Sequence, residues 1–259
     1  MHEREGAEQG LRYIYKLIDL AALGLDASAL PDLLTAAERL GFAGLNITHP
    51  CKQAIIGHLH ELSPDAEALG AVNTVVFRNG KRIGHNTDWW GFAESFRREL
   101  GEVRRDRVLL FGAGGAGAAV AHALLTLGTG ELLIIDPGEG RAAALAASLC
   151  ERFGPRRASG ISGAPEDLRV DGIVNATPLG MAAHPGTAVP ASLLQPERWV
   201  AEIVYFPLET ELLREARLRG CRTMSGGGMA VFQAAEAFRL FTGRAADAER
   251  VLRHFGQMH

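Results

Sequence analysis

Lys52 stands where a lysine can carry out acid–base chemistry. It follows NITHPC at 46–51, and Pro50 is suited to the first turn of a helix. Lys52 would then lie at the positive end of the helix dipole, where a cation is disfavoured, so its amine is suited to exchanging a proton near neutral pH. A solvated surface lysine is the alternative interpretation. Lys52 lies between apolar runs at a position that a helix disfavours for a cation, and such a departure from local preference indicates a functional role.

Other polar residues allow a simpler interpretation. Asp88 ends GHNTD at 84–88 and is suited to capping the helix that follows, and Asn73 in AVNT at 71–74 is suited to a turn. Cys51 lies beside Lys52, but no His/Asp arrangement is specified around it, so a small core residue is the simpler interpretation. The histidines at 49, 58, 60 and 85 do not form a metal-ligand spacing, and we expect no metal.

A glycine-rich loop predicts a nucleotide site. GAGGAG at 112–117 follows the apolar run VLLF at 108–111 and precedes a predicted helix. A dinucleotide fingerprint needs this context, because the loop makes a tight turn and directs helix N-terminal amides at a pyrophosphate. A structural glycine turn and a methyltransferase loop are the alternatives, and the spacing to Asp136 favours the dinucleotide.

Asp136 predicts the kind of dinucleotide. It ends the next predicted strand, 24 residues after Gly112, where a carboxylate can accept from the ribose hydroxyls of adenosine. A 2′-phosphate there would be repelled by Asp136 and Glu139, with only Arg141 to compensate. The sequence therefore favours NAD over NADP. A carboxylate that only caps the next helix is the alternative.

The elements that would position these residues fall into two parts. Residues 13–19 and 44–48 predict strands, 3–9, 30–40 and 64–69 predict helices, and 74–78 and 81–86 predict a hairpin around Asn79-Gly80. A helix over 89–100 and a polar linker at 101–106 follow. Beyond the linker, strands alternate with helices, which is typical of a parallel sheet covered by helices. The predicted strands are 107–111, 131–135, 172–175, 199–204 and 222–224, and the predicted helices are 116–127, 141–153, 229–242 and 245–254.

Composition excludes several other classes of protein. The 259 residues are 47% hydrophobic and 22% charged with a net charge of −3, so no basic surface invites nucleic acid. The uncharged stretch 108–130 is interrupted by glycines and predicts a strand, a loop and a helix rather than a membrane span. Three widely spaced cysteines suit a reducing cytoplasm, and the charged start of the chain is unlike a signal peptide. We therefore expect a cytoplasmic α/β protein.

The motifs, taken in order along the chain, resemble the shikimate dehydrogenase family, and especially its quinate/shikimate dehydrogenase branch. The resemblance covers nearly the whole chain. It is carried by NITHPCKQ at 46–53, GAVNT at 70–74, GHNTD at 84–88, GAGGAG at 112–117, NATPLGM at 175–181, VYFPLET at 204–210 and GMAVFQA at 228–234.

The resemblance implies a fold, a reaction and a place in metabolism. It implies a substrate domain at 1–102, completed by the C-terminal helices at 229–259, and a Rossmann-type dinucleotide domain at 103–228 with a doubly wound parallel sheet. The implied reaction is reversible hydride transfer between a ring C–OH of shikimate or quinate and a nicotinamide, in aromatic amino acid biosynthesis or quinate catabolism. The partner is a small polyhydroxy cyclic carboxylate, with no nucleic acid or membrane, and a homodimer is the candidate assembly.

The resemblance also assigns roles to individual residues. Lys52 and Asp88 would be the catalytic pair, in which Lys52 takes or gives the hydroxyl proton and Asp88 orients it. The substrate would be bound by Thr48, Asn73, Tyr205 and Gln233. The cofactor would be bound by Gly112, Gly114, Gly115, Ala116, Asp136, Arg141, Asn175, Thr177, Pro178 and Gly228.

Two features concern the branch and the start of the chain. Asp136 stands where NADP-using biosynthetic members carry Asn-Arg-Thr, so this chain resembles the NAD-using type. Family members open with a strand and a Ser-x-Ser/Thr-Pro segment that binds the substrate carboxylate, just before a helix that begins near Met-His-Glu. This chain starts at that helix, which has no capping residue before it, and we expect an N-terminal truncation.

A non-catalytic protein that senses shikimate or quinate on the same scaffold is the alternative function. The departure at the start of the chain motivates it, whereas the intact Lys52, Asp88 and Asp136 favour the enzyme.

Overall fold

The computed structural model describes residues 1–163 and 168–257 and divides the chain into two compact units. The first unit is Met1–Thr87 with Gln233–His259, and the second is Asp88–Phe232. From the sequence we expected boundaries at 102 and 229. The structure instead groups α5 (Asp88–Glu99) with the second unit, because Phe92 and Phe96 are fully buried in the core of that unit.

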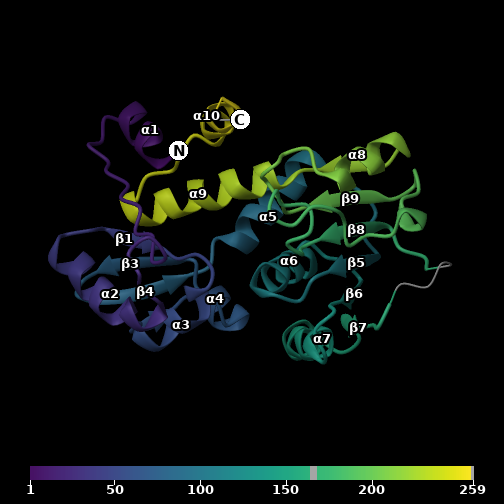
Figure 1. Cartoon of the computed structure of the whole chain (residues 1–259), viewed down its shortest axis with the longest axis horizontal. Helices are drawn as coiled ribbons and strands as arrows, with labels where there is room; N and C mark the ends of the chain where they lie inside the picture. The colour runs from purple at the N-terminus through teal and green to yellow at the C-terminus, as the bar shows by residue number, and fades with distance from the viewer. Residues whose placement is uncertain (164–167, 258–259) are drawn as a thin grey trace. The chain divides into compact units, whose positions relative to one another are not determined.

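The first unit is built on a small mixed sheet with the strand order β1-β3-β4-β2 (Figure 1). β3 and β4 form the predicted hairpin, and its turn residues Asn79 and Gly80 both have positive φ, as a two-residue turn requires. Leu34, Ile55 and Val75 are fully buried in its core. The strands are β1 (Gly44–Asn46), β2 (Glu61–Leu62), β3 (Thr74–Arg78) and β4 (Lys81–His85), and the helices are α1 (His2–Glu8), α2 (Leu30–Arg39), α3 (Cys51–Ala54), α4 (Pro64–Leu69) and α10 (Ala248–Gly256), with short 3₁₀ turns at Ala27–Ala29 and Ile55–His58.

The strand predicted over 13–19 is wrong. These residues form no strand, and β1 is the edge of the sheet as the structure describes it. Side chains hold the segment instead. The Tyr13 ring stacks on the ring of Phe238, with centroids 5.4 Å apart, and Tyr15 stacks on His2. The tyrosines of this segment therefore pack through their rings, and the segment has no hydrogen-bonded neighbour of the kind that a strand needs.

Helix α1 begins at His2 without a side-chain cap, as the sequence indicated. An ion pair connects it to α10, in which Arg250 donates to both carboxylate oxygens of Glu5 at 2.7 and 2.8 Å. The Glu5 side chain is only 2% exposed. Hydrogen bonds from Arg250 and the Asp247 amide hold the pKa of this carboxyl below its usual value, although burial opposes that shift.

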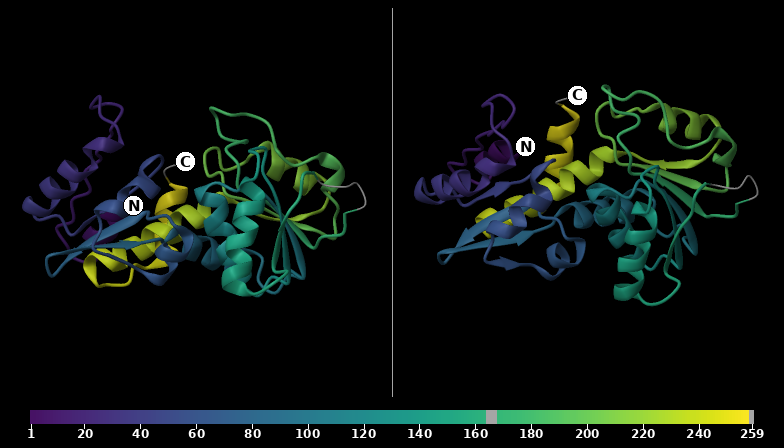
Figure 2. Two further views of the ribbon diagram at one scale, coloured as in Figure 1. Left: turned by 90° about the horizontal axis from the view of Figure 1, so that it is seen from below. Right: turned by 60° about the horizontal axis from the view of Figure 1, so that its bottom comes forward.

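The second unit is a six-stranded parallel sheet with the order β10-β9-β8-β5-β6-β7, and Figure 2 shows its twist. This confirms the parallel sheet predicted from the alternating pattern and the Rossmann-type fold that the resemblance implied. The strands are β5 (Arg107–Phe111), β6 (Glu131–Ile135), β7 (Ala158–Gly160), β8 (Gly172–Asn175), β9 (Trp199–Glu202) and β10 (Arg222–Met224). The helices are α5, α6 (Gly115–Thr126), α7 (Arg141–Phe153) and α8 (Glu211–Leu218), with a 3₁₀ turn at Ala191–Leu193, and α9 (Gly226–Thr242) runs from this unit into the first.

Both faces of this sheet are covered, which explains why its strands are apolar throughout. In β5, Val108 and Leu110 pack into one core with α5, α6 and α7, whereas Leu109 and Phe111 pack into another with α8. The described part of the chain contains no helix long and apolar enough to span a membrane.

Candidate active site

A row of hydrogen-bonded side chains lies at one end of the strands of the small sheet, where β1 and β4 end and β3 begins. Tyr15 Oη donates to Asn46 Oδ1 at 3.0 Å, and Asn46 Nδ2 donates to Thr74 Oγ1 at 3.1 Å. Thr74 Oγ1 in turn donates to Asn73 Oδ1 at 3.1 Å. The register of the sheet explains the cluster, because Thr74 pairs with Asn46 on one side and with His85 on the other.

The row of hydrogen bonds continues from Asn73 to Thr87 and Gln233, which lie in two other predicted motifs. Asn73 Nδ2 donates to Thr87 Oγ1 at 3.0 Å, and the Thr87 amide donates back to Asn73 Oδ1 at 2.8 Å. Thr87 Oγ1 also lies 3.5 Å from Gln233 Oε1 on α9. Asn73 and Thr87 are 3% and 2% exposed. The structure thus brings the predicted residues Asn73 and Gln233 together through Thr87, in a cluster of neutral groups suited to hydroxyl ligands.

Lys52 lies in α3 and is half-buried. Its backbone carbonyl accepts from the Val72 amide at 2.9 Å, which brings the 46–53 motif beside the 70–74 motif. The predicted helix after Pro50 is only one turn long before it tightens into the 3₁₀ turn, so its dipole is small. Thr48 is exposed in the connection between β1 and α3.

Asp88 is 8% exposed and is the first residue of α5, directly after Thr87. It therefore lies within the helix rather than ahead of it as a cap. Thr87 was part of a predicted motif but was assigned no role. Its position between two candidate ligand-binding residues depends on the fold, so the sequence alone contained no signal for it.

The glycine loop of the second unit has the close packing that dinucleotide sites need. A Cβ on Gly112, whose φ is +103°, would lie 2.6 Å from the Ala176 carbonyl oxygen, and one on Gly117 would lie 2.0 Å from the Gly112 carbonyl oxygen. Gly115 is different, because a Cβ there would meet no atom within 4 Å. The loop is therefore closed toward the protein and open at the first residue of α6, where amide groups can face an anion.

Asp136 lies beside this loop with its side chain 5% exposed. Its carboxylate accepts from the amides of Ala113 and Gly138 at 2.7 and 2.8 Å, and Arg141 Nη1 lies 3.5 Å away. Gly140, not Asp136, is the N-cap of α7. The carboxylate thus fixes the glycine loop rather than capping the next helix.

The remaining predicted residues of the second unit lie in three places. Asn175 ends β8, and its Oδ1 accepts from the amide and the hydroxyl of Thr177 at 3.1 and 2.7 Å. Pro178 and Tyr205 are exposed, in the loops after β8 and β9. Gly228 lies in α9, where a Cβ would be 2.1 Å from Ser95 Oγ on α5, so a larger residue would have to displace that side chain.

Sequence reasoning missed Glu202, which ends β9 and is fully buried. It contacts Asn175 and the start of the loop that carries Tyr205. The sequence contained a signal for Glu202, because a lone glutamate in an otherwise apolar strand needs polar partners.

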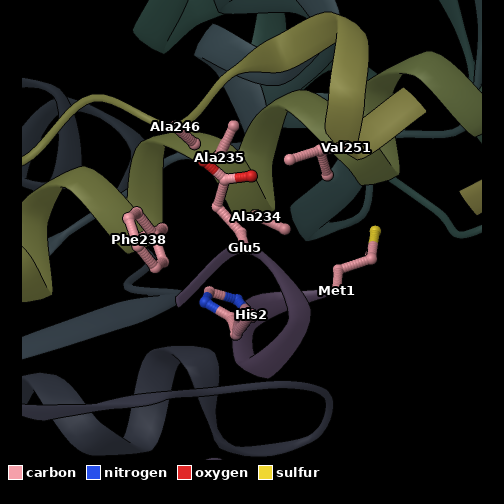
Figure 3. Close-up of a pocket in the computed structure, with 8 residues that line it drawn as sticks. All are labelled: Met1, His2, Glu5, Ala234, Ala235, Phe238, Ala246 and Val251. Carbon is pink, nitrogen blue, oxygen red and sulfur yellow. The ribbon is translucent and has the colours of Figure 1, made fainter. Parts of the chain in front are cut away.

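A small pocket elsewhere in the first unit lies among α1, α9 and α10 (Figure 3). Its polar groups are His2 and Glu5. Burial lowers the pKa of His2 to about 4, so the ring is neutral at pH 7, and Glu5 is bound by Arg250. None of the residues that line the pocket is a predicted site residue.

The chain is similar in sequence and in fold to proteins of one family. The shikimate dehydrogenase substrate binding domain matches residues 1–75, and the shikimate 5′-dehydrogenase C-terminal domain matches residues 226–254. A shikimate dehydrogenase (NADP(+)) of Streptomyces avermitilis is 59% identical over 100% of this chain and 90% of its own length. A quinate/shikimate dehydrogenase (NAD(+)) of Corynebacterium efficiens is 48% identical over 97% of this chain and 90% of its own length. A solved structure of quinate dehydrogenase from Corynebacterium glutamicum in complex with NAD is 47% identical, with a TM-score of 0.93, over 99% of this chain and 92% of that one.

Proposed function

The chain belongs to the shikimate dehydrogenase family, and we propose that it oxidises a ring hydroxyl of shikimate, of quinate or of both, and catalyses the reverse reduction, with a pyridine nucleotide. The buried cluster of Asn73, Thr87 and Gln233 is the observation that carries this proposal for the chain itself. Neutral amides and hydroxyls recognise a polyol by donating to and accepting from its hydroxyl groups.

The glycine loop fits a dinucleotide. Gly112 and Gly117 permit the close turn, and the open space at Gly115 leaves the first amides of α6 accessible to a pyrophosphate. We assign Gly112, Gly114, Gly115 and Ala116 to the pyrophosphate. The remaining cofactor contacts that we propose come from Asp136, Arg141, Asn175, Thr177, Pro178 and Gly228. The bound nicotinamide supplies the hydride-accepting carbon.

We assign the proton transfer to Lys52. Oxidation of an alcohol removes the hydroxyl proton as the hydride leaves, and a neutral lysine amine can accept it, whereas the ammonium returns it on reduction. Asp88 orients the ammonium and the hydroxyl by accepting hydrogen bonds from both. Its near-complete burial limits competition from water. Thr48, Asn73, Gln233 and Tyr205 would hold the substrate ring.

NAD is the cofactor that we propose in preference to NADP. A 2′-phosphate would stand beside the Asp136 carboxylate and be repelled by it, whereas a 2′-hydroxyl could donate to it. The NAD-bound quinate dehydrogenase structure supports this choice, while the 59% identical relative is named for NADP(+). Arg141, at 3.5 Å from Asp136, is the residue through which this chain could accommodate a phosphate.

Replacing Lys52 tests the proposed reaction. Lys52→Met keeps the length of the side chain and removes the amine, so we expect kcat with shikimate or quinate to fall at least about 100-fold, the usual contribution of acid–base catalysis. The dissociation constant for NAD should stay within about twofold, because the glycine loop and Asp136 belong to the other unit.

Lys81→Met is the matched control, since Lys81 lies on β4 and pairs with Glu61 at the surface. It should leave both constants unchanged. Retention of most of the activity by Lys52→Met would show that the amine does not carry the proton.

A further inference from the structure

We propose that Glu202 is a positioning residue that holds together the two loops on the nicotinamide side of the dinucleotide site, residues 175–181 and 203–209. The inference rests on the proposed function, because it takes a dinucleotide bound at the glycine loop as its premise. The strand order gives the side: β6, with Asp136 at its end, lies on one flank of β5, and β8 and β9 lie on the other. A dinucleotide that places its adenosine ribose at Asp136 extends its nicotinamide toward β8 and β9.

The first loop is held through Asn175. Asn175 and Glu202 are register partners at the ends of β8 and β9, and Asn175 Nδ2 lies 3.0 Å from each carboxylate oxygen of Glu202. A carboxylate only accepts, so it fixes the orientation of the amide and directs Asn175 Oδ1 to the amide and hydroxyl of Thr177. The same Nδ2 donates to the Leu179 carbonyl at 2.9 Å, and a Cβ on Gly180 would lie 3.5 Å from Glu202 Oε2.

The second loop begins and ends on the same carboxylate. The Val204 amide donates to Glu202 Oε1 at 3.0 Å, and Thr210 Oγ1 donates to Oε2 at 3.3 Å. Thr210 is also the N-cap of α8, where it accepts from the Leu213 amide. Tyr205 lies between these two anchors, so the carboxylate limits the positions that its ring can take.

Burial of the Glu202 carboxylate carries a cost in free energy. Glu202 is fully buried, its hydrogen-bond partners Asn175, Val204 and Thr210 carry no charge, and burial raises its pKa to about 7. An apolar residue would suit the strand better but would leave these donors without an acceptor. The Glu202 carboxylate therefore positions the two loops rather than stabilising the sheet.

The experiment compares two ligands that differ only in the nicotinamide end. NAD and ADP-ribose are titrated at pH 8 into the wild-type protein and into Glu202→Gln, which keeps the shape but replaces one acceptor by a donor. We expect the dissociation constant for NAD to rise about fivefold to tenfold, the factor that one unmatched buried polar group costs, and that for ADP-ribose to change less than about twofold.

Two further variants bracket this result. Glu202→Leu removes both acceptors and should give a larger loss for NAD in the same direction, and Thr210→Val, which releases only the end of the second loop, should give a smaller one. Glu131→Gln is the matched control, because Glu131 starts β6 and pairs with Arg107 in a half-exposed position. It should leave both dissociation constants unchanged.

Three outcomes would contradict the account, and they differ from one another. Unchanged dissociation constants for both NAD and ADP-ribose in Glu202→Gln overturn the positioning role and leave the proposed function intact. Equal weakening of NAD and ADP-ribose overturns it as well, because the residue would then support the whole unit. A wild-type protein that binds neither ligand overturns the proposed function and, with it, this inference.

Discussion

In the function that we propose, the Asp136 carboxylate serves both structure and cofactor specificity. It accepts from the Ala113 amide in the glycine loop and from the Gly138 amide after β6, so removing it would loosen the turn that the cofactor needs. Its charge is the second contribution. Arg141 is the first residue of α7, where a cation is disfavoured by the helix dipole, and the nearby carboxylate offsets that cost.

We therefore expect Asp136→Asn to change the cofactor preference. The amide oxygen can still accept from the Ala113 amide, while the loss of charge removes the repulsion and frees Arg141 to pair with a 2′-phosphate. The ratio of kcat/KM for NAD to that for NADP should fall at least about tenfold, as for the loss of one close charge interaction. Steady-state kinetics with both cofactors measures it.

Glu151→Gln is the control for this variant, since Glu151 is an exposed carboxylate on α7 and should leave the ratio unchanged. If the two variants have the same ratio as the wild-type protein, the preference is not set at Asp136.

The turn from β5 to α6 is the element on which the cofactor site depends. A Cβ on Gly117 would collide with the Gly112 carbonyl, and one on Gly112 with the Ala176 carbonyl, so neither residue can carry a side chain without moving backbone atoms. β5 is buried on both faces, so the strand cannot shift to make room. The glycines are therefore needed by the turn before any ligand binds.

We expect Gly117→Ala to damage both stability and binding. Its Cβ would lie 2.0 Å from the Gly112 carbonyl oxygen, and overpacking of this kind costs about 1–3 kcal/mol. The melting temperature should fall, and the dissociation constant for NAD should rise. Gly115→Ala provides the contrast, because its Cβ meets no atom within 4 Å and alanine favours a helix. An unchanged melting temperature in Gly117→Ala would contradict the close contact in this turn.

Elements fixed by local chemistry were predictable from the sequence. The Asn79-Gly80 turn and the strands on either side of it appear where expected, because positive φ at both residues is a local requirement. The strand predicted over 13–19 failed, since strand formation depends on a distant neighbour that no local pattern reveals. Helix α8 was not predicted, and its Thr210 cap became recognisable only from the bond to the Leu213 amide.

In the candidate site, too, the local motifs were predictable and the long-range contacts were not. Lys52, Asn73, Asp136 and Gln233 lie in motifs that can be found in the sequence alone. The contacts that join residues across the fold, such as Thr87 between Asn73 and Gln233, depend on strand register and could not be inferred from spacing.

The whole molecule consists of two units, each with its own core, and the chain passes between them at 87–88 and again within α9. The first unit holds the neutral polar cluster and Lys52, and the second holds the glycine loop and Asp136. In the function that we propose, the first set of residues recognises a polyol and the second binds a dinucleotide. We propose that these two sets of residues act in one reaction.

The most direct measurement is the absorbance of reduced nicotinamide after NAD is mixed with the purified protein and either shikimate or quinate. Our account predicts that the reduced band grows with at least one of the two substrates, and that it grows in proportion to the amount of protein. Binding of NAD and of substrate with no growth of the band, with NAD or with NADP, would contradict it and would favour a protein that binds these ligands without catalysing their reaction.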